Sequence, residues 1–392
     1  MGILTWLGTA HGANDDIWQL YVADKINYDD NLFRLSDKVN PTLLLGPDYS
    51  RYDFVNQLSV GGKIHYPISR QRVLVELRAD DNRFIQNRRF DHFSTHDTLT
   101  WQWALGRGWS GNLGYGYQRS LASFAYTQFF LKDVISQQDG FFDFGYTWHP
   151  RWKLSAGLRW QESTHSNRRR RALNRQEVSG SIGLSYTTPS KNSLGLEYRY
   201  SDVDLPNREL KPDTLLDDHY RIQTLGAVAN WRYSGKTRVE GRFGYSMLEN
   251  RHYPQRDFSG VTFRLSAEWE PTGKTRFNLA GWRELQPSQT LDASYMVSQG
   301  VSLYQFWNAT AKILVTGGLI YEALDFEGSP GLAVEPLEKR RDRLWSGLLG
   351  VSYAPQRHLE FGLSYQAQWR TSSRPFLNYA DNSLSVSAKL RF

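Results

Sequence analysis

The amino-acid sequence predicts an all-β fold, namely a transmembrane, up-and-down, antiparallel β-barrel of about 18 strands. Three observations predict it. Windows of alternating polar and apolar residues recur along the chain, short turns alternate with long polar loops, and aromatic residues stand at both ends of the windows. A single barrel domain is expected over residues 14–392. Residues 1–13 are expected to be a truncated signal peptide, because a short apolar stretch there precedes small residues.

The composition excludes other classes of protein. Charged residues make up 22% of the chain, and no apolar run approaches the length of about 20 residues that a spanning helix needs. With 14 Trp, 22 Tyr and 20 Phe, the chain is too aromatic to be disordered. The absence of cysteine argues against thiolate metal sites and disulfide-stapled folds. A net charge of +7 points to anionic partners.

The alternating windows have the period of a β-strand. In residues 152–160 the even positions carry Trp, Leu, Ala, Leu and Trp, whereas the odd positions carry Lys, Ser, Gly and Arg. The same alternation recurs in residues 194–200, 239–247, 261–269 and 359–369. A helix would mix Trp with Lys or Arg on one face. Each window is therefore predicted to be a strand with one wet and one dry face.

The connections between the windows indicate the architecture. Eight short turns are expected at residues 67–70, 106–110, 149–151, 188–192, 234–236, 271–274, 308–311 and 354–357. Nine long polar loops are expected at residues 29–52, 83–95, 119–131, 163–174, 202–217, 249–255, 284–291, 325–341 and 371–379. They join 18 strands and put both termini on the short-turn side. This pattern is typical of a barrel in the outer membrane of a Gram-negative bacterium, which is the predicted location.

Two rows of aromatic residues support a membrane-spanning barrel. The first row lies beside the short turns and comprises Tyr66, Trp103, Trp109, Trp148, Trp152, Tyr186, Trp231, Tyr233, Trp269, Trp307 and Tyr353. The second row comprises Trp160, Tyr198, Tyr200, Tyr245, Trp282, Tyr321, Trp345 and Trp369. About eight strand residues separate the rows, which places two belts ~20–25 Å apart, the height of a barrel's apolar band.

The last strand alternates cleanly and stops on an aromatic residue. It resembles the signal that the barrel assembly machinery reads at the end of outer-membrane proteins. That resemblance implies the machinery as a partner. It implies a recognition role for Leu384, Val386, Ala388, Leu390 and Phe392.

The polar register of the strands is expected to face a hydrated lumen, because about 18 strands enclose more space than side chains fill. Any constriction must then come from folded-in loops. The candidate substrate-binding residues are Arg78, Arg159, Arg199, Arg232, Arg238, Arg242, Arg264 and Arg276. We expect basic residues to exceed acidic ones there by about six. Arg264 is expected close to both Arg242 and Arg276. The arginines are either a ladder for a polyanion or ordinary charges paired with acids.

Arg168, Arg169, Arg170 and Arg171 are expected in an extracellular loop. They would bind acidic polysaccharide or lipopolysaccharide phosphates, or simply form a solvated loop tip. Neither a catalytic motif nor a nucleotide-binding motif is found, so we predict no enzyme, no cofactor and no nucleic-acid partner. No metal site is predicted, although the pairs Asp29-Asp30 and Asp217-Asp218 leave calcium as an alternative.

Residues 26–35, Ile-Asn-Tyr-Asp-Asp-Asn-Leu-Phe-Arg-Leu, carry a family resemblance. They resemble the opening of outer-membrane β-barrel proteins from exopolysaccharide-biosynthesis loci of the exosortase type. The resemblance implies export of an exopolysaccharide, anionic if the lumen is basic. Periplasmic polysaccharide-secretion proteins would be partners, alongside lipopolysaccharide and outer-membrane lipid. Two alternatives stay open: a general or anion-selective porin, and a structural anchor for a secretion complex.

Overall fold

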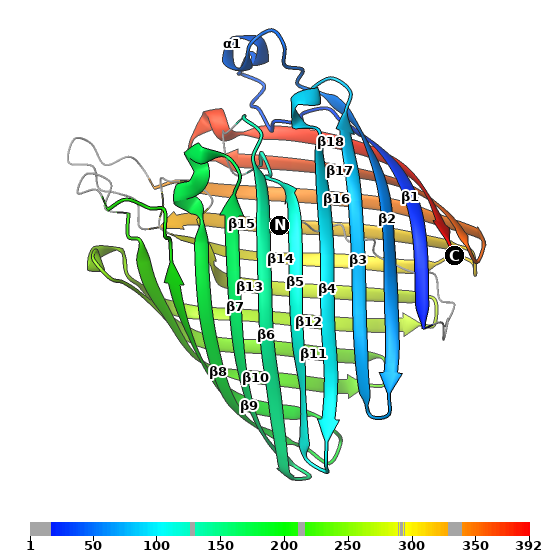
Figure 1. Ribbon diagram of the computed structural model, residues 1–392, viewed down its shortest axis with the longest axis vertical. Helices are drawn as coiled ribbons and strands as arrows, with labels where there is room; N and C mark the ends of the chain where they lie inside the picture. The colour runs from blue at the N-terminus through cyan, green and yellow to red at the C-terminus, as the bar shows by residue number, and fades with distance from the viewer. Residues whose placement is uncertain are drawn as a thin grey trace.

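The computed structural model describes residues 17–125, 130–210, 216–288, 290, 293, 295–327 and 339–392. An 18-stranded antiparallel sheet closes on itself, because each strand pairs with its sequence neighbours and β1 also pairs with β18 (Figure 1). The predicted fold, strand number and up-and-down topology are confirmed. Among the described residues, no helix has the length and apolar composition needed to cross a membrane.

The strands are long enough to span a bilayer when tilted. Their bounds are β1 Trp18–Asp29, β2 Asp53–Ile68, β3 Gln71–Phe84, β4 His92–Leu105, β5 Trp109–Leu121, β6 Val134–His149, β7 Trp152–His165, β8 Arg175–Thr187, β9 Ser193–Asp204, β10 His219–Ser234, β11 Thr237–Asn250, β12 Phe258–Thr272, β13 Thr275–Pro287, β14 Tyr295–Asn308, β15 Ile313–Glu327, β16 Arg341–Gln356, β17 Leu359–Ser372 and β18 Tyr379–Arg391. The long loops contain α1 Pro41–Leu45 and the 3₁₀ turns η1 Arg88–Phe90, η2 Arg168–Leu173, η3 Pro254–Arg256 and η4 Pro375–Leu377.

Strand periodicity divides the barrel wall into an outer and a luminal face. In β1 the side chains of Trp18, Leu20, Val22 and Ile26 are all exposed, although they are apolar. Cross-strand partners point to the same side of a sheet, so the same apolar register continues around the closed ring. This register is the outer face, and the alternate residues face the lumen. All the predicted aromatic-belt residues lie on the outer face except Trp282, which pairs with the luminal Arg264 and is buried.

The long loops cover part of the extracellular mouth. Phe33 from the β1–β2 loop, Phe90 from η1 and Phe124 from the β5–β6 loop pack together against Phe84 of β3. Arg370 of β17 donates a hydrogen bond to the backbone carbonyl of Ala125. Since β5 and β17 lie far apart around the ring, the β5–β6 loop reaches over the lumen rather than standing outward. Its inward fold agrees with the expectation that loops would supply a constriction.

Candidate functional site: a charged luminal wall

The eight predicted arginines all occupy the luminal register, but they do not form one ladder. Arg242 of β11 is the direct cross-strand partner of Arg264 of β12. On β13, however, the partner of Arg264 is Trp282, six residues from Arg276 and therefore about 20 Å away along the strand. The expected neighbourhood of Arg264 and Arg276 is wrong, because a hairpin pairs residues at equal distances from its turn. Arg276 lies only two residues after that turn.

Five luminal arginines instead share one cavity of about 1220 Å³. It is bounded by strands from β4 to β14, and its guanidinium groups belong to Arg159, Arg175, Arg199, Arg242 and Arg264. Arg175 opens β8 and is not among the predicted site residues. Acidic side chains line the same cavity, among them Glu177, Glu197 and Glu284.

Each arginine of this cavity has a carboxylate partner. Arg159 lies 3.1 Å from Asp139, and Arg264 Nε lies 2.9 Å from Glu284 Oε1. Arg199 and Arg242 share Glu197, at 2.8 and 3.4 Å, and Arg175 pairs with Glu177. The guanidinium groups of Arg159, Arg242 and Arg264 remain about half exposed, so each of their pairs contributes only about 0–1 kcal/mol. The pairs can therefore exchange partners with a passing ion.

The predicted basic excess in the lumen is wrong. Asp139 and Glu284 face the lumen, as do Asp80 and Glu322, and they bring the luminal acids of the described strands close to the number of bases. Several of them lie near strand ends. The strands extend beyond the windows of clear alternation, so the sequence pattern alone does not assign a face to the residues near their ends.

A local excess of positive charge remains near the short turns. Arg72, Lys153, Arg232 and Arg276 face the lumen there and form no ion pair with any residue that the structure describes. The guanidinium of Arg276 lies over the ring of Phe306, 4.9 Å from its centre. The periplasmic half of the lumen is thus more basic than its middle.

Trp282 is a buried aromatic residue in the luminal register beside Arg264. Its Nε1 donates a hydrogen bond to Ser298 Oγ at 2.8 Å, and Ser298 Oγ lies 2.6 Å from Glu322 Oε1. The guanidinium of Arg264 lies 5.6 Å from the centre of the Trp282 ring. The indole therefore helps to orient Arg264 in the lumen.

The motif at residues 26–35 fastens the barrel seam at its extracellular end. Asn31 is fully buried, and its Nδ2 donates to the carbonyls of Leu35 and of Ala380 in β18, both at 2.8 Å. Arg34, in the left-handed region at φ +56°, bridges Asp29 and Asp381. The motif therefore ties the first strand to the last.

The predicted extracellular arginine patch is smaller than expected. Arg168, Arg169 and Arg171 of η2 are exposed, but Arg170 is buried, and its Nε lies 3.5 Å from Asp133. Burial opposes ionisation of Asp133, yet hydrogen bonds from the His165 ring and from the backbone of Asn167 outweigh it and lower the pKa of Asp133. Arg170 thus packs inside the loop, so the expectation of four surface arginines is wrong at this position.

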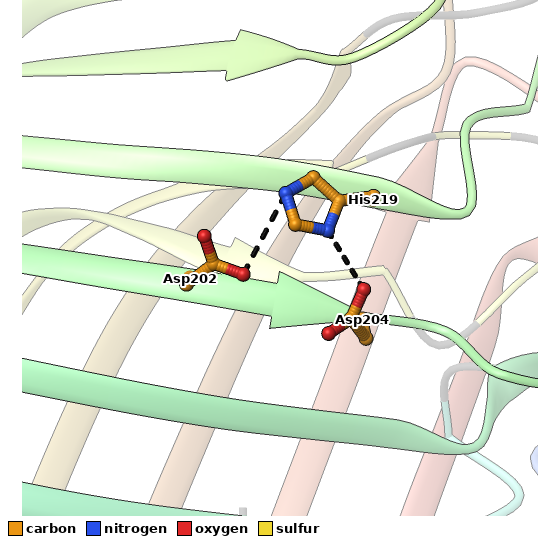
Figure 2. Close-up of side chains that lie close together, drawn as sticks. All are labelled: Asp202, Asp204 and His219. Atoms are coloured by element: carbon orange, nitrogen blue, oxygen red, sulfur yellow. Dashed lines mark hydrogen bonds and ion pairs between the residues drawn. The ribbon is translucent and has the colours of Figure 1, made fainter.

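Among the residues that the structure describes, three side-chain groups have donor atoms placed closely enough to hold a metal ion. Figure 2 shows Asp202 and Asp204 of β9 beside His219 of β10, whose Nδ1 lies 2.7 Å from Asp204 Oδ1 and whose Nε2 lies 3.6 Å from Asp202 Oδ1. This group lies on the outer face near the extracellular end. Sequence reasoning missed it because the carboxylates and the imidazole meet only through strand pairing.

The other two groups contain the acidic pairs singled out in the sequence. In the structure Asp381 lies beside Asp29 and Asp30, and His252 lies beside Asp217 and Asp218. Burial opposes ionisation of Asp217, but hydrogen bonds from the His252 ring and from neighbouring backbone amides prevail and lower its pKa. The carboxylates are therefore already engaged by the protein's own donors.

The residues of the expected assembly signal lie on the outer face of β18. Leu384, Val386, Leu390 and Phe392 are exposed there, and Ala388 shares their register. The same strand pairs with β1 to close the ring. Recognition by the assembly machinery stays a prediction.

Comparisons with known proteins found a partial family match and several similar solved structures. A family model described as "Putative beta-barrel porin 2" matches residues 223–392, and no curated protein matches the chain. Among solved structures, OccAB3 of Acinetobacter baumannii is 11% identical with a TM-score of 0.49, covering 96% of this chain and 99% of that one. A BenF-like porin of Pseudomonas fluorescens Pf-5 is 9% identical with a TM-score of 0.48, covering 97% and 100%.

The closed ring and the family match support one general statement. The chain is a porin-like β-barrel of the Gram-negative outer membrane. The resemblance to exopolysaccharide-locus proteins rests on residues 26–35, which lie outside the matched segment.

Proposed function

We propose that the protein is a diffusion porin, a passive path for small hydrophilic solutes with a weak preference for anions. The observation that carries the proposal is the row of solvent-exposed arginine–carboxylate pairs along the luminal cavity. Compensated charges keep the wall hydrated without binding any one ion tightly.

Passage follows from the weakness of these pairs. A solute carboxylate replaces Glu197 or Glu284 beside an arginine at little cost, because the displaced acid stays in water. The planar guanidinium offers two parallel donors to each carboxylate. A solute can therefore move from one arginine to the next without a deep binding minimum.

The preference for anions follows from the cations near the short turns. Arg232 and Arg276 have no acidic partner among the described residues, so their field attracts anions into the periplasmic half of the lumen. Salt would weaken this preference, because the Debye length falls to about 3 Å at 1 M ionic strength.

Single-channel recording in planar bilayers tests the proposal. We expect the protein to be open at rest, with a reversal potential in a potassium chloride gradient that favours chloride. The double variant Arg232→Gln/Arg276→Gln should lower the chloride-to-potassium permeability ratio, because it removes two of the four unpaired luminal cations. Arg88→Gln/Arg168→Gln, which removes the same charge from extracellular turns, should leave the ratio unchanged. A closed or cation-selective wild-type channel would contradict the proposal.

Export of an anionic exopolysaccharide is the second candidate function. Its support is the resemblance carried by residues 26–35 together with the direct neighbourhood of Arg242 and Arg264. The same recording separates the two candidates. An exporter covered by inward-folded loops would be nearly closed alone, and a barrel that merely anchors a secretion complex would not conduct even with its partners present.

A further inference from the structure

The eight short turns share a charge pattern. Each turn contains one lysine or arginine and no acidic residue. The eight cations, here called the periplasmic ring, are Arg70, Arg107, Arg151, Lys191, Lys236, Lys274, Lys312 and Arg357. All eight side chains are exposed. Most of the long loops differ, because six of the nine contain both acidic and basic residues.

The charge of the periplasmic ring is not neutralised by the protein. Within the described part of the chain, none of the eight cations forms an ion pair with a carboxylate. The hydrogen bonds that they do make go to neutral groups: Arg70 donates to the Gly106 carbonyl at 2.7 Å, and Lys236 donates to the Pro271 carbonyl at 2.9 Å. The ring therefore presents a positive field to whatever surrounds this end of the barrel.

Outer-face aromatic residues fix the height of the ring. Trp148 and Trp152 flank the turn of Arg151, and their rings stack on one another. Trp269 and Trp307 precede the turns of Lys274 and Lys312 in the same way. Trp and Tyr in such belts lie at the level of lipid head groups. The cations lie just beyond the belt, where long side chains reach phosphate groups.

We propose that the periplasmic ring binds the phosphate groups of anionic phospholipids in the inner leaflet of the outer membrane. The observations favour a membrane over a docked protein, because the cations encircle the barrel beside every hairpin. Neighbouring turns are two strands apart, about 10 Å, so each cation meets a separate head group. Clusters of four to eight basic residues next to a membrane-spanning segment attract anionic lipid in this way. This inference does not depend on the proposed transport function.

Quenching of tryptophan fluorescence by brominated lipids tests the proposal. The intact protein is reconstituted into phosphatidylcholine vesicles that contain brominated phosphatidylglycerol or brominated phosphatidylcholine. The turn variant replaces Arg107, Lys191, Lys274 and Lys312 with Gln. The matched loop variant replaces Arg88, Arg168, Arg169 and Arg171 with Gln, which removes the same charge from exposed extracellular positions.

We expect wild type and the loop variant to prefer phosphatidylglycerol about fivefold, and the turn variant to lose most of that preference. Salt at 1 M should abolish it, and soluble glycerol phosphate at 50 mM should not compete. Equal preference in the turn variant and wild type would overturn the proposal. The absence of a phosphatidylglycerol preference in wild type would also overturn it. The partner of the periplasmic ring would then be an acidic periplasmic protein. Circular dichroism of each variant establishes that the barrel is folded.

Discussion

At the scale of single residues, Asn31 shows how a polar side chain holds two distant segments. Its amide contacts the β1–β2 loop and β18, and its Oδ1 accepts a hydrogen bond from the Leu35 backbone at 2.9 Å. Asp30 extends the link, since its carboxylate accepts hydrogen bonds from the backbone and side chain of Asn382, both at 2.8 Å. Buried polar groups of this kind cost free energy when a partner is removed.

Asn31→Ala should lower the free energy of unfolding by about 2–4 kcal/mol, because the carbonyls of Leu35 and Ala380 and the amide of Leu35 each lose a hydrogen bond. The measurement is the temperature at which the barrel loses its characteristic mobility in SDS gel electrophoresis. Asn40→Ala is the matched control, since Asn40 caps the short helix α1 at an exposed position. Equal effects of the two substitutions would show that the seam does not depend on Asn31.

At the scale of the strands, β1 and β2 break the apolar pattern of the outer face. Asp24 lies between Val22 and Ile26 in the lipid-facing register, and its Oδ1 accepts a hydrogen bond from Asn56 Nδ2 of β2 at 2.7 Å. Asp24 lies six positions after Trp18 and four positions before Tyr28 in β1. The Asp24–Asn56 pair therefore lies well inside the apolar band. Polar groups there are unfavourable, because lipid offers no hydrogen-bond partner.

Replacing both Asp24 and Asn56 with Leu should raise the free energy of unfolding by about 1–2 kcal/mol, since acidic residues facing lipid cost somewhat less than the ~2–4 kcal/mol of basic ones. Equilibrium unfolding by guanidinium in lipid vesicles measures the change. Ala388→Leu is the control, because it adds an apolar side chain on the same face of the neighbouring strand without removing a polar group. A double variant less stable than wild type would mean that another protein surface covers the pair.

At the scale of the whole molecule, closure of the barrel depends on the pairing of β18 with β1. The backbone amide of Phe392 donates to the Leu20 carbonyl at 2.9 Å, so the final residue belongs to the seam. Its ring projects from the outer face and is 65% exposed, which leaves it available to a partner during assembly.

Phe392→Ser should strongly reduce the amount of barrel in the outer membrane, while refolding of the purified variant in detergent stays close to wild type. Quantification of heat-modifiable protein in membrane fractions checks the first result, and refolding yield checks the second. Phe361→Ser is the control, because Phe361 lies on the same outer face of β17 and pairs with Ala388. Equal losses for both variants would assign the effect to the lost apolar side chain alone.

Much of the luminal site could be predicted from residues taken singly. Arg242 and Arg264 were placed correctly in the lumen, because a strand period of two leaves each side chain only two faces and lipid rejects charge on one of them. Their partners could not be predicted. The sequence predicts a loop from residue 284, whereas Glu284 lies in β13, and Glu197 meets Arg242 only through the registers of β9, β10 and β11.

The sequence by itself determined the barrel, its strand number, the sides of its short turns and long loops, and the outward or inward direction of nearly every strand residue. These properties are local, since they follow from periodicity and turn chemistry. Tertiary structure alone decided which charges meet, where Trp282 points, how residues 26–35 close the seam and how the β5–β6 loop reaches Arg370. Those contacts join segments far apart in the chain, and their geometry depends on how each hairpin is staggered against the next.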